Sequence, residues 1–196
     1  MTTSIIQQFP ESFESERLLI RVPHPGDGTI IHEAVSESQD RLVPWFIWAQ
    51  TVATIENQEQ FVRQAYSKYL LNEDMMLCLF LKENGKFIGG SGLHFRGLKI
   101  PAFEIGYWIR SGYEGKGYVI EAVNAITKLG FEVGQANRIF IRCDSHNNRS
   151  QSVARRAGYL YEGTFRNFER RANTGELTDM MYFALTRDDY EKLKEK

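Results

Sequence analysis

The spacing of apolar side chains along the chain switches between the period of a strand and the period of a helix. Apolar residues recur at every second position in residues 18–22 and 77–81, which predicts two strands. In residues 57–71 and 118–130 they recur at every third or fourth position, which predicts two amphipathic helices. The other expected elements are, in chain order, a helix carrying Ile31, Ala34 and Val35, strands over 87–95 and 103–109, a strand over 138–143, a short helix over 150–157, and strands over 159–169 and 179–185.

Two turns with glycine connect strands in this pattern. Asn84-Gly85 offers two positions suited to positive φ and predicts a tight hairpin, and a turn around Asn173-Thr174-Gly175 joins the last strand pair. The order is an antiparallel meander followed by a β-α-β-α run. It predicts an α/β fold with a mixed, largely antiparallel sheet and helices on both faces, in a single domain over residues 1–196. A ligand is expected where neighbouring strands splay or reverse their order.

Charge and cysteine usage narrow the class of protein. The 196 residues include 24 Lys and Arg and 25 Asp and Glu, so the formal net charge is -1 and no overall field attracts nucleic acid or anionic membrane. No apolar run of about 18 residues is present, and the first residues lack the charged and apolar regions of a signal peptide. These features predict a cytoplasmic protein without a direct nucleic-acid or membrane partner, and leave a homodimer open. Cys78 and Cys143 lie in apolar runs without metal-site spacing, so buried thiols and no metal are expected.

The turn at Gly115 and Gly117, between the strand 103–109 and the helix 118–130, is the most informative local feature. Two glycines let a backbone approach a ligand without Cβ atoms in the way, and the first N–H groups of a helix attract anions. Ile120 stands where a dinucleotide turn would have its third glycine, and the P-loop spacing is absent. The turn therefore predicts a site for another pyrophosphate, with a plain tight turn as the alternative.

Three segments together resemble one known family. Residues 104–109, the glycine turn and residues 147–159 resemble the GNAT superfamily of acetyl-CoA-dependent N-acetyltransferases, in particular its ribosomal-protein N-terminal (serine/alanine) branch. The likeness runs from Glu16 to Met181. It implies a GNAT-like fold in which a splayed strand pair admits acyl-CoA, and acetyl-CoA as co-substrate. The cofactor-binding residues it implies are Trp108, Ile109 and Arg110 through backbone pairing with pantetheine, Gly115, Lys116, Gly117, Tyr118 and Val119 at the pyrophosphate, and Asn147 and Ser150 beside the thioester.

The chain departs from the family pattern at three positions. Glu114 replaces the usual Gln or Arg at the head of the glycine loop, and Val119 replaces the usual final Gly or Ala. Ala154 occupies the place of the tyrosine that many GNAT enzymes use as the acid toward the departing thiolate. In the branch resembled, Ser150 takes that role. Its position before a short helix is also typical of an N-cap, with Asn147 and Asn148 as competitors for the cap.

Two carboxylates are candidate bases. An amine attacks a thioester only when neutral, and at pH 7 an α-amine with a pKa of about 7.7–8.0 is roughly a tenth neutral, whereas a lysine is far below one per cent neutral. By resemblance, Glu169 would act through a water; an ion pair with Arg166, Arg170 or Arg171 is the alternative. Glu104 is the second candidate base, although a carboxylate that orients its neighbours or pairs with Arg110 is the favoured interpretation there.

The acceptor is expected beside an aromatic segment. Trp45, Phe46 and Trp48 lie between the first two helices, where they could form either core or an acceptor groove. His94 and His146 show no partner pattern that would make them catalytic. The predicted function is an acetyl-CoA-dependent N-acetyltransferase that uses direct transfer, with a protein N-terminal α-amine of the ribosomal-protein type as the acceptor. A small amine (polyamine, amino acid or antibiotic) and a non-catalytic acyl-CoA-binding regulatory module are the alternatives.

Overall fold

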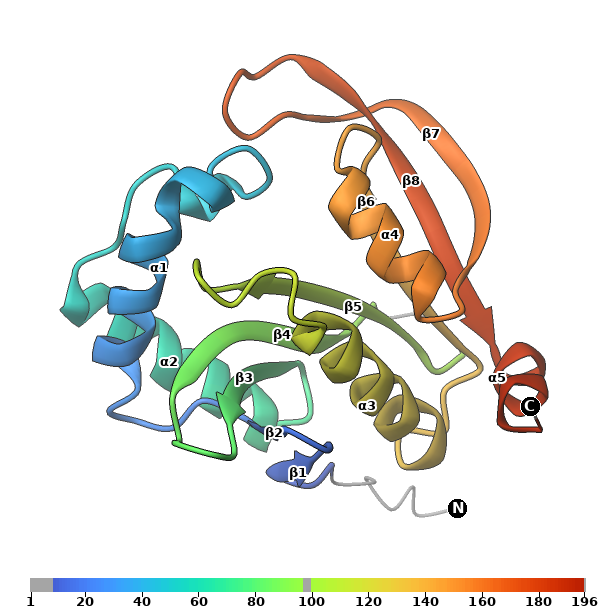
Figure 1. The fold of residues 1–196 in the computed structure, drawn as a ribbon, viewed down its shortest axis with the longest axis horizontal. Helices are drawn as coiled ribbons and strands as arrows, with labels where there is room; N and C mark the ends of the chain where they lie inside the picture. The colour runs from blue at the N-terminus through green and yellow to red at the C-terminus, as the bar shows by residue number, and fades with distance from the viewer. Residues whose placement is uncertain (1–8, 97–99, 196) are drawn as a thin grey trace.

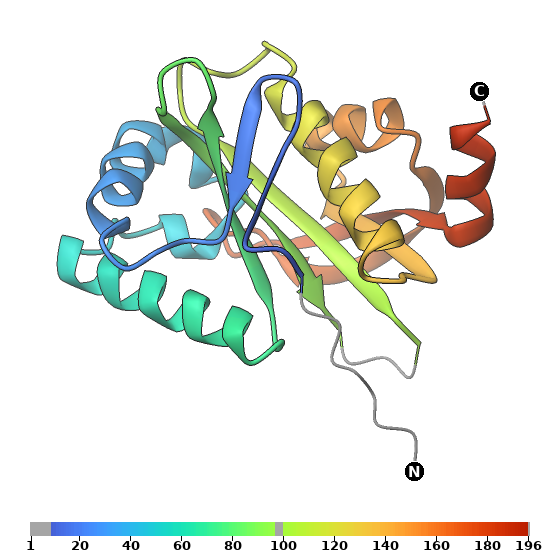
Figure 2. The ribbon, with the colours of Figure 1, turned by 90° about the horizontal axis from the view of Figure 1, so that it is seen from below.

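The computed structural model describes residues 9–96 and 100–195 and contains one eight-stranded sheet with helices on both faces (Figures 1 and 2). The elements are β1 (Ser12–Glu14), β2 (Leu18–Arg21), α1 (Gly28–Leu42), a short 3-10 helix η1 (Ile47–Ala49), α2 (Ile55–Leu70), β3 (Met75–Leu81), β4 (Phe87–Phe95), β5 (Ala102–Ile109), α3 (Tyr118–Glu132), β6 (Arg138–Asp144), α4 (Asn148–Arg156), β7 (Leu160–Arg170), β8 (Leu177–Thr186) and α5 (Arg187–Lys194).

The sheet is mostly antiparallel, and its one parallel pair creates the opening that matters for function. The strand order is β1-β2-β3-β4-β5-β6-β8-β7. The parallel strands β5 and β6 pair only from Ala102 to Glu104, opposite 138–140, although β5 continues to Ile109 and β6 to Asp144. Beyond Glu104 the two strands therefore diverge. The prediction of a mixed sheet with a splayed strand pair is confirmed.

Two hydrophobic cores lie on opposite faces of the sheet. Ile126 of α3 packs in the larger core with Leu79 and Ile105, whereas Ile31 of α1 packs in the smaller core with Phe80. Adjacent residues of β3 thus enter different cores, because successive side chains of a strand point to opposite faces. This double burial explains why β3 is apolar at nearly every position. In Figure 2, α1 and α2 cover one face, and α3 and α4 cover the other.

Several local details differ from the sequence-based expectation. At the predicted Asn84-Gly85 turn only Gly85 has positive φ, at +70°, and the hairpin closes with the Gly85 N–H bonded to Leu81 O. The connection is a longer loop that needs one left-handed residue and not two. Strand β1 was not expected. Helix α5 was also missed, although a capping box between Thr186 and Asp189 marks its start.

Candidate active site

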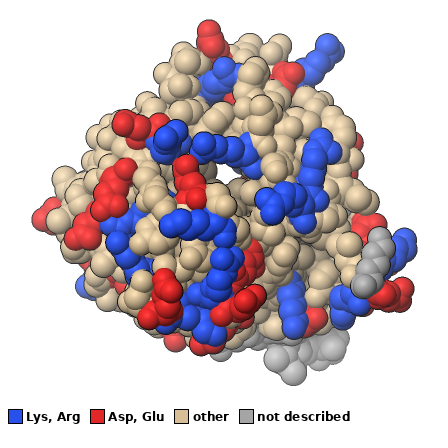
Figure 3. Space-filling view, viewed as in Figure 1, with Lys and Arg blue, Asp and Glu red and all other residues tan. Residues whose placement is uncertain are grey.

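A cavity of about 960 Å³ opens at the divergence of β5 and β6. Its walls come from η1 and the segment before it, the glycine turn, the first turns of α3 and α4, and the end of β7. Six arginines and four carboxylates line it, so its charge suits an anionic ligand. Figure 3 shows the molecule from the same side as Figure 1, with a hollow near the centre of the view and Lys and Arg side chains at the margin of the hollow.

The glycine turn has the conformation that a phosphate site requires. Gly115 and Gly117 have φ of +73° and +84°, and a Cβ on Gly115 would meet no atom within 4 Å. Gly117 is the N-cap residue of α3. No described backbone carbonyl accepts a hydrogen bond from the N–H groups of Gly115, Gly117, Tyr118 or Val119. These free donors at a helix start fit the pyrophosphate of acetyl-CoA.

A brace behind the turn was not predicted from the sequence. Arg17 donates from Nη1 to Lys116 O at 3.1 Å, pairs with Glu121 Oε2 at 2.7 Å, and lies over the Tyr118 ring at 4.5 Å. Arg17 thereby ties the turn to the β1–β2 connection. The Lys116 side chain does not line the cavity and points instead over the ring of Tyr113. Within the turn, Lys116 therefore contributes a backbone carbonyl to the brace.

Glu114, the acidic departure from the family pattern, pairs with a cation. Its Oε2 accepts a hydrogen bond from Arg149 Nη1 at 3.0 Å. Arg149 belongs to the first turn of α4, so the pair also links the glycine turn to that helix. Because the carboxylate is paired, its repulsion toward a bound phosphate is reduced. Val119, the second departure, lines the cavity through its position in α3.

The edge of β5 that faces the cavity differs in detail from the expectation. The Arg110 N–H donates to Ile88 O at 2.7 Å, and Arg110 O accepts from the Tyr113 N–H at 3.1 Å. Alternation along the antiparallel ladder then directs the backbone groups of Trp108 toward β4 as well. The groups of Tyr107 and Ile109 point to the side where β6 diverges. Of the three residues expected to pair with pantetheine, Ile109 is therefore the one whose backbone groups are free to pair with an extended ligand.

Ser150 lies in the first turn of α4, and Asn147 is its N-cap. Asn147 Oδ1 accepts a hydrogen bond from the Ser150 N–H at 3.1 Å. The helix begins at Asn148, two residues earlier than predicted, so the N-cap interpretation of Ser150 is wrong. The Ser150 hydroxyl is instead 2.9 Å from Tyr107 Oη and lines the cavity. Ala154, in the place of the usual tyrosine, is fully buried.

Both cysteines are buried free thiols, as predicted. Burial raises the pKa of Cys143 to about 11 and that of Cys78 to about 12. Cys143 lines the cavity, but at neutral pH almost none of it is thiolate, which is the reactive form. This supports direct transfer over an acyl-cysteine intermediate.

Glu104 is fixed by two arginines. Its Oε2 accepts from Arg96 Nε at 2.7 Å and its Oε1 from Arg142 Nε at 2.9 Å, and only 8% of the residue is exposed. The favoured partner Arg110 is wrong, because Arg110 lies six residues further along the same face of β5 and pairs with Glu37 of α1 at 2.7 Å. Both carboxylate oxygens of Glu104 thus accept hydrogen bonds from arginine side chains.

Glu169 shares Arg142 with Glu104. Its Oε1 accepts from Arg142 Nη1, so the partner comes from β6 and is none of the three arginines predicted. Burial disfavours the charge on Arg142, but hydrogen bonding and the charges of both carboxylates outweigh it and raise the pKa of the guanidinium. Glu169 Oε2 has no hydrogen-bond partner among the described residues. Of the two candidate bases, Glu169 has an oxygen free for water.

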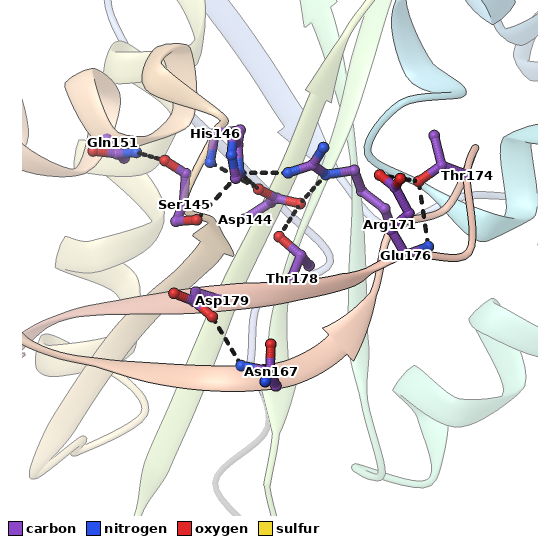
Figure 4. A network of polar contacts seen from close by, with 10 residues as sticks. All are labelled: Asp144, Ser145, His146, Gln151, Asn167, Arg171, Thr174, Glu176, Thr178 and Asp179. Carbon is purple, nitrogen blue, oxygen red and sulfur yellow. Dashed lines mark hydrogen bonds and ion pairs between the residues drawn. The ribbon is translucent and has the colours of Figure 1, made fainter.

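A polar network holds the β7–β8 hairpin against the loop that leads to Ser150 (Figure 4). Asp144 at the end of β6 accepts from the His146 N–H at 2.7 Å, Thr178 Oγ1 at 2.9 Å and Arg171 Nε at 3.3 Å. Burial opposes its charge, but these hydrogen bonds lower the pKa of the carboxyl. Asp144 thus fixes the two walls of the cavity relative to each other. His94, by contrast, pairs with Asp74 at 2.9 Å and does not line the cavity.

The aromatic segment before and within η1 forms an open wall. Trp45 is 37% exposed and Trp48 is 49% exposed, and both line the cavity with Phe46. Trp48 lies with its ring centroid 6.0 Å from that of Trp108 and 5.0 Å from that of Phe46. Of the two interpretations of this segment, the geometry favours a groove over core.

Comparison with known proteins identifies the family of this chain. The family model described as "Acetyltransferase (GNAT) domain" matches residues 17–160. "Putative ribosomal N-acetyltransferase YdaF" of Bacillus subtilis (strain 168) is 26% identical over 177 residues, which cover 90% of this chain and 95% of that protein. The solved structure of RimL, the ribosomal L7/L12 alpha-N-protein acetyltransferase, in complex with coenzyme A has a TM-score of 0.81 at 22% identity, covering 92% of this chain and 98% of RimL. The microcin C7 self-immunity acetyltransferase MccE, in complex with acetyl-CoA and AMP, has a TM-score of 0.83 at 19% identity, covering 92% and 99%.

The chain belongs to the GNAT acetyltransferase family. It is an acetyltransferase that uses acetyl-CoA as its co-substrate, and its cavity has the donors and the charge that this co-substrate requires. Within residues 9–96 and 100–195, no helix is long and apolar enough to cross a membrane. The same part of the chain holds no group of three or more His, Cys, Asp or Glu arranged for a metal ion.

Proposed function

We propose that the enzyme transfers the acetyl group to the α-amine of a protein N-terminus, as its ribosomal-protein relatives are named for doing. The observation that carries this proposal is that one cavity joins the glycine turn, the free edge of β5, Ser150 and Glu169. The cavity is open at its aromatic wall, where Trp45 and Trp48 are available to a peptide.

The donor half of the cavity would bind acetyl-CoA along its length. The N–H groups of Gly115, Gly117, Tyr118 and Val119 would hold the pyrophosphate. The backbone of Ile109 would pair with the pantetheine arm, and its amide would stabilise the oxyanion during transfer. Asn147 keeps Ser150 beside the thioester by capping the helix.

The acceptor half would remove a proton from the amine and stabilise the leaving sulfur. Glu169 has one oxygen free for a water that bridges to the amine, whereas Glu104 has both oxygens bound by arginines. Glu104 then serves to hold Arg142, and through it Glu169, in place. Ser150 would donate a hydrogen bond to the departing thiolate.

Gly117→Val is expected to weaken CoA binding by tenfold or more, because a Cβ at a φ of +84° strains the turn and crowds its amides. Isothermal titration calorimetry with CoA measures the change. Gly85→Val is the matched control, since Gly85 also has positive φ and open space around it but lies in the β3–β4 hairpin. Equal CoA affinity for Gly117→Val and the parent protein would show that the turn is not the phosphate site.

The acceptor class is tested with purified protein, acetyl-CoA and a panel of acceptors, by following thiol release. The panel contains peptides that begin with Ser or Ala, the same peptides with a blocked N-terminus and an internal lysine, polyamines and aminoglycosides. We expect the free N-terminal peptides to react fastest, because an α-amine is neutral far more often than a lysine at pH 7. Acetylation of lysine side chains alone contradicts the proposal.

A small-molecule acceptor is the second candidate. The likeness to MccE concerns the fold alone at 19% identity, but it shows that this architecture also occurs in an enzyme whose structure holds a nucleotide beside acetyl-CoA. Arginines outnumber carboxylates on the cavity wall, so a polycationic amine is disfavoured relative to an amine that carries an anionic group. Preferential reaction of such an amine over every peptide would support this candidate.

A further inference from the structure

Tyr107 of β5 contacts the residue proposed to act on the leaving group. Its hydroxyl lies 2.9 Å from Ser150 Oγ and 3.1 Å from the backbone carbonyl oxygen of the same residue. The ring packs against the larger core, and both side chains line the cavity. The Cys143 thiol also hydrogen-bonds the Ser150 side chain, and Tyr107 provides the only hydroxyl group of the described residues that contacts Ser150 Oγ.

The two hydroxyl groups can share their protons in two ways. In the first arrangement, Ser150 donates to Tyr107 Oη and Tyr107 donates to the Ser150 carbonyl, so Ser150 has no proton for another partner. In the second, Tyr107 donates to Ser150 Oγ and leaves the Ser150 proton free to point into the cavity. The observed distances allow both. A negative charge in the cavity beside Ser150 favours the second.

We propose that Tyr107 is a positioning residue that turns the hydroxyl proton of Ser150 toward the departing sulfur. The inference rests on the role proposed above for Ser150. Tyr107 holds Ser150 Oγ at a fixed place and, by moving its own hydrogen bond from the carbonyl to Oγ, orients the Ser150 proton as negative charge forms on sulfur.

The step balances without a proton leaving either hydroxyl group. The neutral amine nitrogen forms a bond to the acetyl carbon, the bond between that carbon and sulfur breaks with its electron pair going to sulfur, and the thiolate accepts a hydrogen bond from Ser150. The proton lost by the amine leaves through Glu169 and water. Burial raises the pKa of Tyr107, against the opposing effect of its hydrogen bond with Ser150, so Tyr107 stays protonated throughout.

Tyr107→Phe tests the proposal, because it removes one hydroxyl group and keeps the ring. We expect kcat to fall about tenfold, the rate equivalent of one lost hydrogen bond, with the KM for acetyl-CoA and the affinity for CoA unchanged. Tyr159→Phe is the matched control: its buried hydroxyl is 2.6 Å from Thr127 Oγ1, outside the cavity. It should lower the melting temperature and leave kcat unchanged. Turnover is expressed per CoA-binding site, so that unfolded protein does not count.

A double-mutant cycle with Ser150→Ala separates this inference from the proposed function. If Tyr107 acts through Ser150, adding Tyr107→Phe to Ser150→Ala changes kcat by less than about twofold. Multiplication of the two single effects would overturn the inference while leaving the role of Ser150 intact, and so would a Tyr107→Phe enzyme as active as the Tyr159→Phe control. Normal turnover in Ser150→Ala alone would overturn the role of Ser150 and, with it, the inference.

Discussion

Replacing Ser150 with alanine is expected to lower turnover by a factor of about 10²–10⁴, the range that a positioned acid or hydrogen-bond donor contributes. CoA binding should remain nearly unchanged, because the phosphate site at Gly115 and Gly117 lies on another element. The fold should also be retained, since Asn147 caps the helix and the Ser150 N–H stays in place in the variant. Steady-state kinetics with acetyl-CoA and a serine-starting peptide, together with calorimetry for CoA, measure the two effects separately.

Two further variants identify the cause of a loss of turnover in Ser150→Ala. Ser36→Ala is the matched control, because Ser36 is also a helical serine, but its hydroxyl bonds within its own helix, to His32 O, and it lies outside the cavity. It should leave turnover unchanged. Asn147→Ala, in contrast, should lower the free energy of unfolding by about 1 kcal/mol through loss of the cap. Ser150→Ala with the stability loss of Asn147→Ala and full turnover would assign Ser150 a structural role.

The fold was predictable because most of its elements carry a periodic signal of their own. Strand β3 and helix α3 are apolar at the spacing that their burial demands, and Gly117 marks the start of α3. Strand β1 has only three residues, with at most one partly buried, so it had no pattern to detect. Helix α5 has a capping box at its start but a short, mostly charged sequence that resembles a solvated tail.

The candidate site was predictable where it depends on local backbone and not where it depends on pairing between strands. The glycine turn shapes its own conformation, so its positive φ values could be expected from Gly115 and Gly117 alone. The partners of Glu104 and Glu169 could not be derived, because Arg142 meets them only through the order of β5, β6, β8 and β7. Arg17 and Tyr107 were missed for the same reason: each acts on a residue more than 40 positions away.

The ladder between β4 and β5 shows how one register decides the roles of neighbouring residues. Sequence alone places Trp108, Ile109 and Arg110 together beside the ligand. The hydrogen bond from the Arg110 N–H to Ile88 O assigns alternate backbone groups to β4 and leaves those of Ile109 toward the cavity. Arg110 pairs with Glu37 at this end of β5, whereas Glu104, six residues earlier on the strand, pairs with Arg96 and Arg142.

Glu169→Gln is expected to lower turnover with an N-terminal peptide by a factor of about 10²–10⁴ at low pH and by much less at high pH. The reason is the proton that the amine must lose before it attacks. Below the α-amine pKa of about 7.7–8.0 most acceptor molecules are charged and depend on the base, whereas above it they are neutral without help. The ratio of parent to variant turnover, measured from pH 6 to pH 9.5, should therefore decrease as pH rises.

The substitution also removes the negative charge that pairs with Arg142. Its control must therefore also remove a carboxylate charge that is paired with an arginine. Glu162→Gln provides it, because Glu162 lies on the same strand and pairs with Arg138 of β6, but does not line the active-site cavity. Glutamine at either position can still accept a hydrogen bond from the arginine, so strand packing is preserved in both variants. Glu162→Gln should match the parent at every pH. A Glu169→Gln defect of constant size across the pH range would mean that the carboxylate binds the acceptor or holds the β7–β8 hairpin, and Glu104 would then become the stronger candidate base.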